Sequence, residues 1–299
     1  MQERIKADNL CKRYGSLTAL DQASLTAYSS ECLGIFGLSN AGKSALLRLL
    51  AGMESPDSGM ITSTETGAAI ALQSPANNSA LTPSEIMLLW ATLYGIPCGK
   101  RRAAVRETLA LVGLDSERDR RIGTLSAGVR KLVELARALI SPSNLLLLDE
   151  PMVGLDSDMR RRIWEHLLKI RSYDHKTIII ATSRSEDAEL CDRIILLHEG
   201  RVLAAGTPVQ LRGLVGPEAM TIKPVSTRGI HSNKAGWSGM IGREQDGSLV
   251  VELDAGSRPT ELLRQISTDV AAVRFRSRGM DSVLDELLSR PELLSSRDG

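Results

Sequence analysis

The stretch from Gly37 to Ser44 restricts what this chain can fold into more than any other part of its sequence. It reads Gly-Leu-Ser-Asn-Ala-Gly-Lys-Ser and fits the pattern G-x-x-x-x-G-K-[ST] at every fixed position. Small residues in such a turn let consecutive backbone N–H groups point at a polyphosphate, with Lys43 reaching its β- and γ-phosphates and the Ser44 hydroxyl on Mg²⁺. The stretch therefore predicts a nucleotide site.

The residues on either side supply the structure that such a loop requires. Residues 31–36, Glu-Cys-Leu-Gly-Ile-Phe, can form a short buried strand, and residues 45–51, Ala-Leu-Leu-Arg-Leu-Leu-Ala, are apolar and helix-forming. The loop then opens a helix whose N-terminal dipole faces the phosphates. Strand, loop and helix in this order are the context that the motif needs.

The composition argues against several other classes of protein. Lys plus Arg (37) against Asp plus Glu (36) leaves a formal charge of +1, which gives no electrostatic footprint for nucleic acid. No apolar run approaches the ~18 to 20 residues that span a bilayer, so any membrane span would come from a partner. The cysteines have no C-x-x-C spacing, which predicts reduced structural thiols in a cytosolic protein. They are Cys11, Cys32, Cys98 and Cys191.

With 299 residues, the chain is long enough for a main domain and a smaller one. Residues 5–10 and 24–27 read as short strands of an antiparallel edge layer, and residues 68–73 as a further strand. From residue 74 to residue 140 the strand signals give way to helical periodicity, which predicts a helical insertion. The apolar positions at helical spacing are Ile86, Leu89, Trp90 and Leu93.

Strand signals return in the second half of the main domain. Residues 145–149 and 177–181 read as strands with a helix at about 158–171 between them, which is a βαβ unit and implies a parallel sheet. Residues 194–197 and 201–204 then read as a hairpin around Glu-Gly. An α/β core with a parallel sheet is therefore expected.

The composition shifts past about residue 216, where the pattern of strands and helices starts again. We expect a small α+β domain over residues 216–299, in which no catalytic constellation is visible. Its predicted elements are a strand at 220–222, a hairpin at 241–253, a helix at 259–266, a strand at 270–275 and a helix at 281–289.

Two carboxylates stand at the end of the most apolar predicted strand, Leu-Leu-Leu-Leu-Asp149-Glu150. A fully buried parallel strand ends with its last residues facing the ligand site of such a sheet. Asp149 would hold Mg²⁺ through water, and Glu150 would polarise the water that attacks a γ-phosphate. Two solvated acids at a strand end are the structural alternative, which the nearby phosphate loop disfavours.

These motifs, together with Leu-Ser-Ala-Gly-Val-Arg-Lys at residues 125–131, resemble the nucleotide-binding subunit of an ABC transporter over roughly residues 3–212. The last motif stands where that family carries its Leu-Ser-Gly-Gly-Gln signature. The resemblance implies a P-loop NTPase core with an antiparallel β edge layer and an inserted helical subdomain at about 74–140. It thus implies an ATP-binding domain at residues 1–215 and an accessory domain at residues 216–299.

The resemblance also implies roles for single residues. Tyr14 matches the aromatic that stacks on adenine, and Gln73 matches the glutamine that contacts Mg²⁺ and the attacking water and senses the membrane partner. Gly154-Leu155-Asp156 matches the loop that crosses to the other subunit. The structural alternatives are an ordinary turn tyrosine, a surface glutamine and a helix-entry turn.

The expected site residues fall into three sets. Catalysis is expected from Glu150, Gln73 and Lys43, and metal binding from Ser44, Gln73 and Asp149. Contacts to ATP are expected from Tyr14, Gly37, Leu38, Ser39, Asn40, Ala41, Gly42, Lys43, Ser44, Ala45, Ser126, Ala127, Gly128, Asp156 and Arg184.

Two departures from the family pattern bear on activity. Ala127 replaces the first signature glycine and Val129 replaces the glutamine, so we expect a weakened signature, because a Cβ narrows the approach of the backbone to phosphate. Arg184 stands where the family usually has a histidine that bonds the γ-phosphate. It either binds phosphate, as a longer and permanently charged donor, or turns outward as a surface arginine.

The resemblance therefore implies a cytosolic ATPase subunit that lies peripherally on the cytoplasmic face of a membrane and powers a separate permease. The class of ATPase that the chain resembles implies that this transporter is an exporter. ATP and Mg²⁺ are the expected cofactors; a second nucleotide-binding subunit and transmembrane permease subunits are the expected partners, with no nucleic acid. The alternative is a degenerate regulatory subunit that clamps ATP beside an active partner. A soluble ATPase of translation or repair is disfavoured, because tandem cassettes and a long coiled coil are not seen.

The resemblance implies roles for two further parts of the chain, residues 82–97 and the C-terminal domain. Residues 82–97 would by resemblance receive a coupling helix from the permease, although most of their apolar side chains are expected to pack within the helical subdomain. The C-terminal domain is similar to the tail of drug- and sodium-extruding ATPases, and it would dimerise, regulate or cap the fold.

Overall fold

The computed structural model describes residues 2–65, 67–72, 79–224, 241–243, 248–253 and 270–295. These residues form two compact units, Met1–Ala205 and Gly206–Gly299. The division lies before helix α7 (Pro208–Val215), so this helix belongs to the second unit, whereas the expected boundary places it in the first.

The first unit is built on a six-stranded sheet with the order β5-β6-β7-β3-β8-β9. All four strand pairs from β5 to β8 are parallel, as the βαβ pattern predicts. The chain therefore visits the sheet out of sequence order, which brings the end of β3 beside the end of β7. The strands are β3 (Cys32–Phe36), β5 (Ala69–Ala71), β6 (Leu145–Asp149), β7 (Thr177–Thr182), β8 (Arg193–His198) and β9 (Arg201–Gly206).

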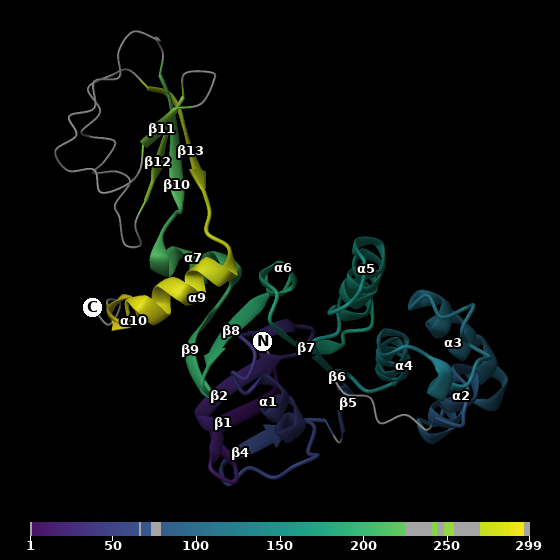
Figure 1. Cartoon of the computed structure of the whole chain (residues 1–299). Helices are drawn as coiled ribbons and strands as arrows, with labels where there is room; N and C mark the ends of the chain where they lie inside the picture. The colour runs from purple at the N-terminus through teal and green to yellow at the C-terminus, as the bar shows by residue number, and fades with distance from the viewer. Residues whose placement is uncertain are drawn as a thin grey trace. The chain divides into compact units, whose positions relative to one another are not determined.

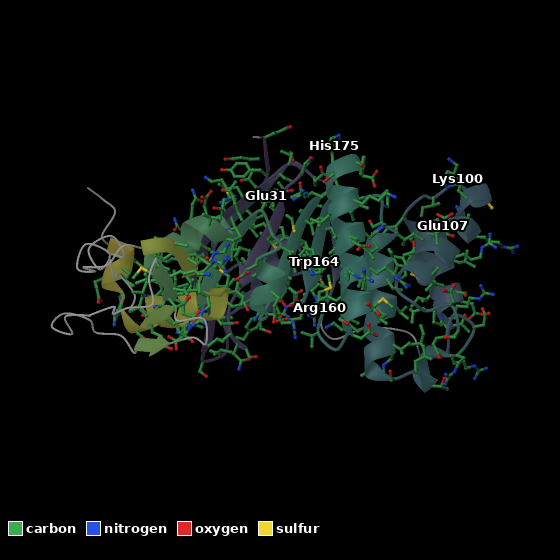
Figure 2. All side chains as sticks on the ribbon, turned by 90° about the horizontal axis from the view of Figure 1, so that it is seen from above. Glu31, Lys100, Glu107, Arg160, Trp164 and His175 are labelled. Atoms are coloured by element: carbon green, nitrogen blue, oxygen red, sulfur yellow. The ribbon has the colours of Figure 1, made fainter. Side chains whose placement is uncertain are left out.

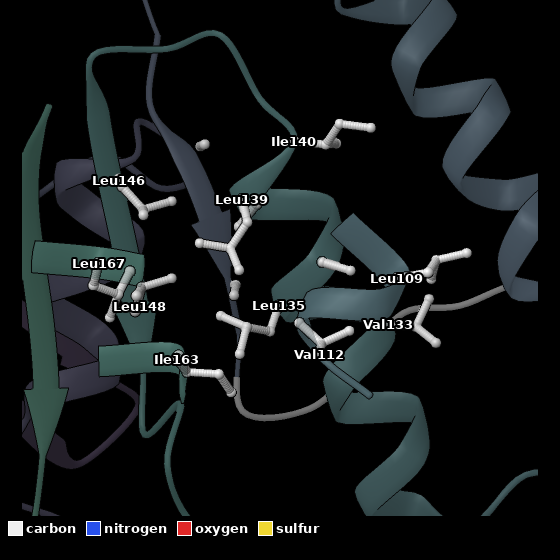
Figure 3. Close-up of a cluster of buried hydrophobic side chains, with 14 of the residues drawn as sticks. Leu109, Val112, Val133, Leu135, Leu139, Ile140, Leu146, Leu148, Ile163 and Leu167 are labelled. Carbon is white, nitrogen blue, oxygen red and sulfur yellow. The ribbon is translucent and has the colours of Figure 1, made fainter. Parts of the chain in front are cut away.

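The central strands are apolar throughout because both faces of the sheet are covered. Side chains alternate along β6, so Leu145 and Leu147 enter one buried cluster while Leu146 and Leu148 enter the other. Figure 3 shows Leu146 and Leu148 beside the helices α4 (Ala127–Leu139) and α5 (Ser157–Tyr173). The opposite cluster includes side chains of α1 (Lys43–Leu50).

An antiparallel sheet of three strands, in the order β2-β1-β4, covers the α1 side of the first unit (Figure 1). Its strands are β1 (Glu3–Tyr14), β2 (Leu17–Tyr28) and β4 (Ser58–Ser63). Both β1 and β2 are longer than expected. The β1–β2 register shifts around Leu10, and Asn9 and Gln22 have positive φ, so bulges interrupt the alternation on which the sequence prediction depended.

The helical insertion contains α2 (Pro83–Leu93), α3 (Cys98–Leu111), the 3-10 turn η1 (Ile122–Thr124) and α4. Helix α2 begins with a capping box between Thr82 and Glu85. The expected apolar face of α2 is wrong in part, because Leu89 is 50% exposed and Leu93 is 64% exposed. Its buried positions are instead Pro83, Ile86, Met87 and Ala91.

The second unit contains a four-stranded antiparallel sheet in the order β11-β12-β10-β13, with helices after it. This matches the expected α+β class. The predicted helix at 259–266 lies outside the described residues, as does the turn of the predicted hairpin. The elements are β10 (Ala219–Pro224), β11 (Ile241–Arg243), β12 (Leu249–Glu252), β13 (Val270–Arg276), α9 (Met280–Ser289) and α10 (Glu292–Ser295).

Two expectations drawn from composition can be compared with the described residues. Among them, no helix is both long enough and apolar enough to cross a membrane. The cysteines are free thiols in the described residues; Cys32 and Cys191 are buried, Cys11 is half-buried and Cys98 is exposed.

The central position of β6 leads to a stability prediction. Leu147 is fully buried, so Leu147→Ala should lower the free energy of unfolding by about 2–5 kcal/mol, through lost burial and a residual cavity. Urea denaturation followed by circular dichroism measures the loss. Leu93→Ala, on the exposed part of α2, is the matched control and should change stability by less than about 0.5 kcal/mol. Equal losses in both variants would contradict the assignment of the core.

Candidate functional site

The phosphate loop connects the end of β3 at Phe36 to the start of α1 at Lys43. This confirms the predicted succession of strand, loop and helix. Gly42 is the residue before the helix and has a φ of 103°, and Asn40 has a φ of 66°. These left-handed conformations turn the loop back on itself at the helix N-terminus, where free backbone N–H groups attract anions.

Two glycines of the loop lie too close to neighbouring backbone for any side chain. A Cβ added at Gly37 would meet the carbonyl oxygen of Leu197 at 2.2 Å, and one added at Gly42 would meet that of Ala19 at 2.3 Å. Gly200 also donates a backbone hydrogen bond of 2.9 Å to Ala41. The loop is therefore held between the β1–β2 hairpin and the end of β8.

The ammonium group of Lys43 lies against its own loop. Lys43 is only 6% exposed, and its Nζ donates to the carbonyl oxygens of Gly37 at 2.8 Å and Leu38 at 3.0 Å. The same Nζ lies 3.3 Å from Oε1 of Glu150. The structure thus brings together the cation of the phosphate loop and the expected general base.

Asp149 and Glu150 end β6 at the same edge of the sheet, and both are buried. Burial raises the pKa of Asp149, against the lowering effects of a hydrogen bond from the Ser44 hydroxyl and of the Lys43 ammonium. One buried oxygen of each carboxylate, Oδ1 of Asp149 and Oε2 of Glu150, has no hydrogen-bond partner among the described residues. Such a buried oxygen requires a partner that the described part of the chain does not supply.

This donor set fits Mg²⁺, which prefers oxygen ligands and is usually held by one or two carboxylates together with phosphate oxygens and water. Ser44 and Asp149 would hold the ion at the loop, as the sequence motifs predict. Gln73, the third expected ligand, lies outside the described residues.

The backbone of Glu150 has a φ of 49°, an uncommon conformation for a residue with a side chain. Its N–H donates to the carbonyl of Ala181 at 2.9 Å, and its carbonyl accepts from Val153 at 3.3 Å. Hydrogen bonds at both its N–H and its carbonyl thus hold Glu150 in this uncommon conformation. Its carboxylate is held beside Lys43 as a result.

A cavity of about 640 Å³ opens over the loop, which is a volume typical of small-molecule sites. Its lining includes Tyr14 and Ala19 from the hairpin, Asn40 and Ser44 from the loop, and Glu150 from the sheet edge. Arg48 of α1 lines it as well, and no sequence motif pointed to this residue. Its position one turn after Ser44 was the available signal, because residues i and i+4 share a helix face.

Tyr14 lies at the cavity with its ring and its hydroxyl both engaged. The hydroxyl donates to Glu54, and Arg48 donates to Glu54 at 2.8 Å and to the Tyr14 oxygen at 3.4 Å. The Nζ of Lys12 lies 5.6 Å from the ring centroid. The hydrogen bond from Tyr14, followed by the charge of Arg48, holds the pKa of Glu54 below its usual range. The position of Tyr14 fits the expected contact to a base.

The signature residues lie elsewhere in the first unit. Ser126 caps α4, its Oγ accepting from the N–H of Val129 at 3.3 Å, and Ser126, Ala127 and Gly128 are all exposed. The described lining of the cavity includes none of them. Within one chain, then, the signature and the phosphate loop are not brought together.

Asp156 and Arg184 are likewise outside that lining. Asp156 caps α5 by accepting from Met159 at 2.8 Å, and it is exposed. Arg184 begins the short helix α6 (Ser185–Ala188) and pairs with Glu186 at 3.2 Å and Asp187 at 3.6 Å. In the described structure, Arg184 therefore makes its ion pairs within the segment that forms α6.

Comparisons with known proteins agree with this geometry. Residues 20–153 match the model of the family described as ABC transporter. A Nod factor export ATP-binding protein I of Rhizobium sp. (strain N33) is 37% identical over 209 residues, which cover 66% of this chain and 68% of that protein. The protein of the same description from Rhizobium etli is 34% identical over 231 residues, covering 73% of both.

Solved structures show the same fold. A dimeric bacterial ABC transporter cassette has a TM-score of 0.64 and 25% identity, and the match covers 68% of this chain and 98% of that one. A Clostridium perfringens protein described as part of an ABC transporter complex has a TM-score of 0.60 and 26% identity, over 71% of this chain and 92% of that one. Motifs, fold and relatives agree, and this chain belongs to the ABC transporter family as an ATP-binding subunit.

Proposed function

We propose that this chain hydrolyses ATP and thereby drives a separate membrane permease, as the motor of an exporter. The observation that carries the proposal is the buried contact of 3.3 Å between Lys43 of the phosphate loop and Glu150 at the end of β6. It supports a site in which one side chain holds the terminal phosphates while its neighbour accepts a proton from water. Export is supported by the relatives, whose shared description is Nod factor export.

The chemistry follows from the roles of the described residues. The loop N–H groups and Lys43 would hold the β- and γ-phosphates, and the Tyr14 ring would stack on the base. Bound Mg²⁺, held by Ser44 and Asp149, would neutralise charge on the phosphates. Glu150 would orient a water molecule in line with the leaving group and take its proton. The Nζ of Lys43 lies 3.3 Å from Oε1 of Glu150, so the phosphate-binding cation and the proposed proton acceptor are neighbours.

A second copy of the chain, or a related subunit, would complete each site. Ser126, Ala127 and Gly128 are exposed at the N-terminus of α4 and are absent from the described lining of the chain's own cavity. A helix N-terminus with free N–H groups is suited to a phosphate presented by another molecule. The similar dimeric cassette supports such an assembly.

This chain would sit on the cytoplasmic face of a membrane, attached to a permease partner that is embedded in the membrane. Leu89 and Leu93 of α2 are exposed, although large apolar side chains prefer burial. Together with Leu88 and Trp90, which are partly buried against the core, they offer an apolar surface at the helical insertion. The Clostridium perfringens relative, part of a transporter complex, supports this arrangement.

A regulatory role with little turnover is the second candidate, and one observation favours it. Arg184 occupies the place of the family histidine and is paired with Glu186 and Asp187 of its own helix. In this candidate the chain clamps ATP beside an active partner subunit. The altered signature, with Ala127 and Val129, would reduce activity further.

Glu150→Gln tests the proposed hydrolysis. The amide cannot accept the proton of water, so the kcat for ATP should fall by about 100-fold or more while ATP still binds. Phosphate release in the presence of Mg²⁺ measures kcat, and titration with a fluorescent ATP analogue measures binding. Glu165→Gln, an exposed change on α5, should leave both values as in the wild type. An unchanged kcat in Glu150→Gln would remove Glu150 from its assigned role.

Arg184→His separates the two candidates. Because Arg184 lies outside the described cavity lining and is paired with two acids, the motor proposal expects kcat to change by less than about threefold. The same phosphate-release measurement checks this. A wild type that binds ATP without turnover, together with an active Arg184→His variant, would establish the regulatory candidate instead.

A further inference from the structure

Lys131 connects two parts of the first unit, the beginning of α4 and the turn that follows β6. It lies in the first turns of α4, close after the exposed residues Ser126 to Gly128. Its Nζ donates to the backbone carbonyl of Glu150 and lies 3.4 Å from the carbonyl oxygen of Val153. One side chain thus joins the signature helix to the turn that contains the proposed general base.

That turn is a place where an added contact has a structural effect. Glu150 has positive φ, a conformation that persists only where surrounding contacts impose it. The turn is otherwise held by the hydrogen bond from Glu150 N–H to Ala181 and by the bond from Val153 N–H to the Glu150 carbonyl. Lys131 adds side-chain hydrogen bonds to the Glu150 and Val153 carbonyls.

The surroundings of Lys131 show that its ammonium group is not merely solvated. Burial lowers the pKa of Lys131, while the charges of Glu150 and Asp149 raise it. Partial burial makes a charge-assisted hydrogen bond stronger than it would be at the surface. Lys131 therefore contributes a cation on the α4 side of Glu150, whereas Lys43 contributes one on the side of the phosphate loop.

We propose that Lys131 is a positioning residue for Glu150: it ties the first turns of α4 to the backbone of Glu150 and Val153 and so holds the catalytic turn in place. The proposal rests on the proposed function, in which Glu150 is the general base. In a dimer, residues 126–128 of one copy meet the nucleotide held by another copy. In the first copy, Lys131 then links residues 126–128, at the partner's nucleotide, to Glu150, at that copy's own nucleotide. One side chain would thus connect the two nucleotide sites of the dimer.

A kinetic experiment tests the proposal with three variants of the full chain. Lys131→Met removes the ammonium and keeps most of the aliphatic stem, Lys131→Arg keeps a donor, and Lys100→Met is the matched control. Lys100 is exposed on α3, at the outer edge of the helical insertion in Figure 2. Lys131→Met should lower kcat for ATP by about 10- to 100-fold, because a small displacement of a catalytic group is costly.

The affinity for ATP distinguishes positioning from general damage to the fold. In Lys131→Met the Kd for an ATP analogue should stay within about twofold of the wild-type value, since Lys131 lies outside the described cavity lining. Lys131→Arg should recover most of kcat. Wild-type kcat in Lys131→Met, or a loss of kcat that Lys131→Arg does not recover, would overturn the proposal.

Hydrogen exchange provides a measurement that does not depend on turnover. Without nucleotide, the amides of Glu150 and of residues 152–155 should exchange several-fold faster in Lys131→Met than in the wild type or in Lys100→Met, because the turn opens more often. Equal exchange in all of these proteins would overturn the tie even if kcat falls. A wild type that lacks ATPase activity would refute the proposed function alone, and exchange would still decide the role of Lys131.

Discussion

The first unit has to compensate the buried charges at the carboxyl edge of its parallel sheet, and its other features depend on how this is done. Lys43, Asp149 and Glu150 are all almost inaccessible to solvent, and removing charges from water costs several kcal/mol for each ion unless partners compensate. The compensation is incomplete, because one oxygen of each carboxylate has no hydrogen-bond partner in the described part of the chain. An ATP-binding subunit can tolerate this arrangement if its ligands supply the missing interactions, and in the proposed function Mg²⁺ beside the phosphates would do so.

The sequence alone predicted those parts of the site that depend on local patterns. The phosphate loop, the βαβ unit and the strand ending in Asp149 and Glu150 are each contained in a short segment, so residue type and spacing are sufficient. Each of these elements lies where it was expected. The length of β1 was missed because bulges break the alternation of apolar and polar residues. The exposure of Leu89 and Leu93 was missed because α2 is apolar on more than one side, so periodicity does not identify its buried face.

Contacts between distant segments were beyond the reach of sequence patterns. Tyr14 was expected at the base, but its hydrogen-bonding group of Arg48 and Glu54 joins segments that are separated along the chain. The contact of Lys131 with the Glu150 carbonyl likewise depends on the packing of whole elements. None of these contacts has a spacing rule that would reveal it in advance.

The close packing of the phosphate loop on the β1–β2 hairpin has a consequence for what the cavity accepts. Gly42 lies against Ala19 of the hairpin, and the same hairpin carries Tyr14 at its end. The hairpin with the tyrosine proposed to meet the base and the loop proposed to hold the phosphates are therefore packed directly on one another. In the proposed function, the separation of tyrosine and loop would select a ligand by the distance between its aromatic end and its charged end, as well as by either group alone.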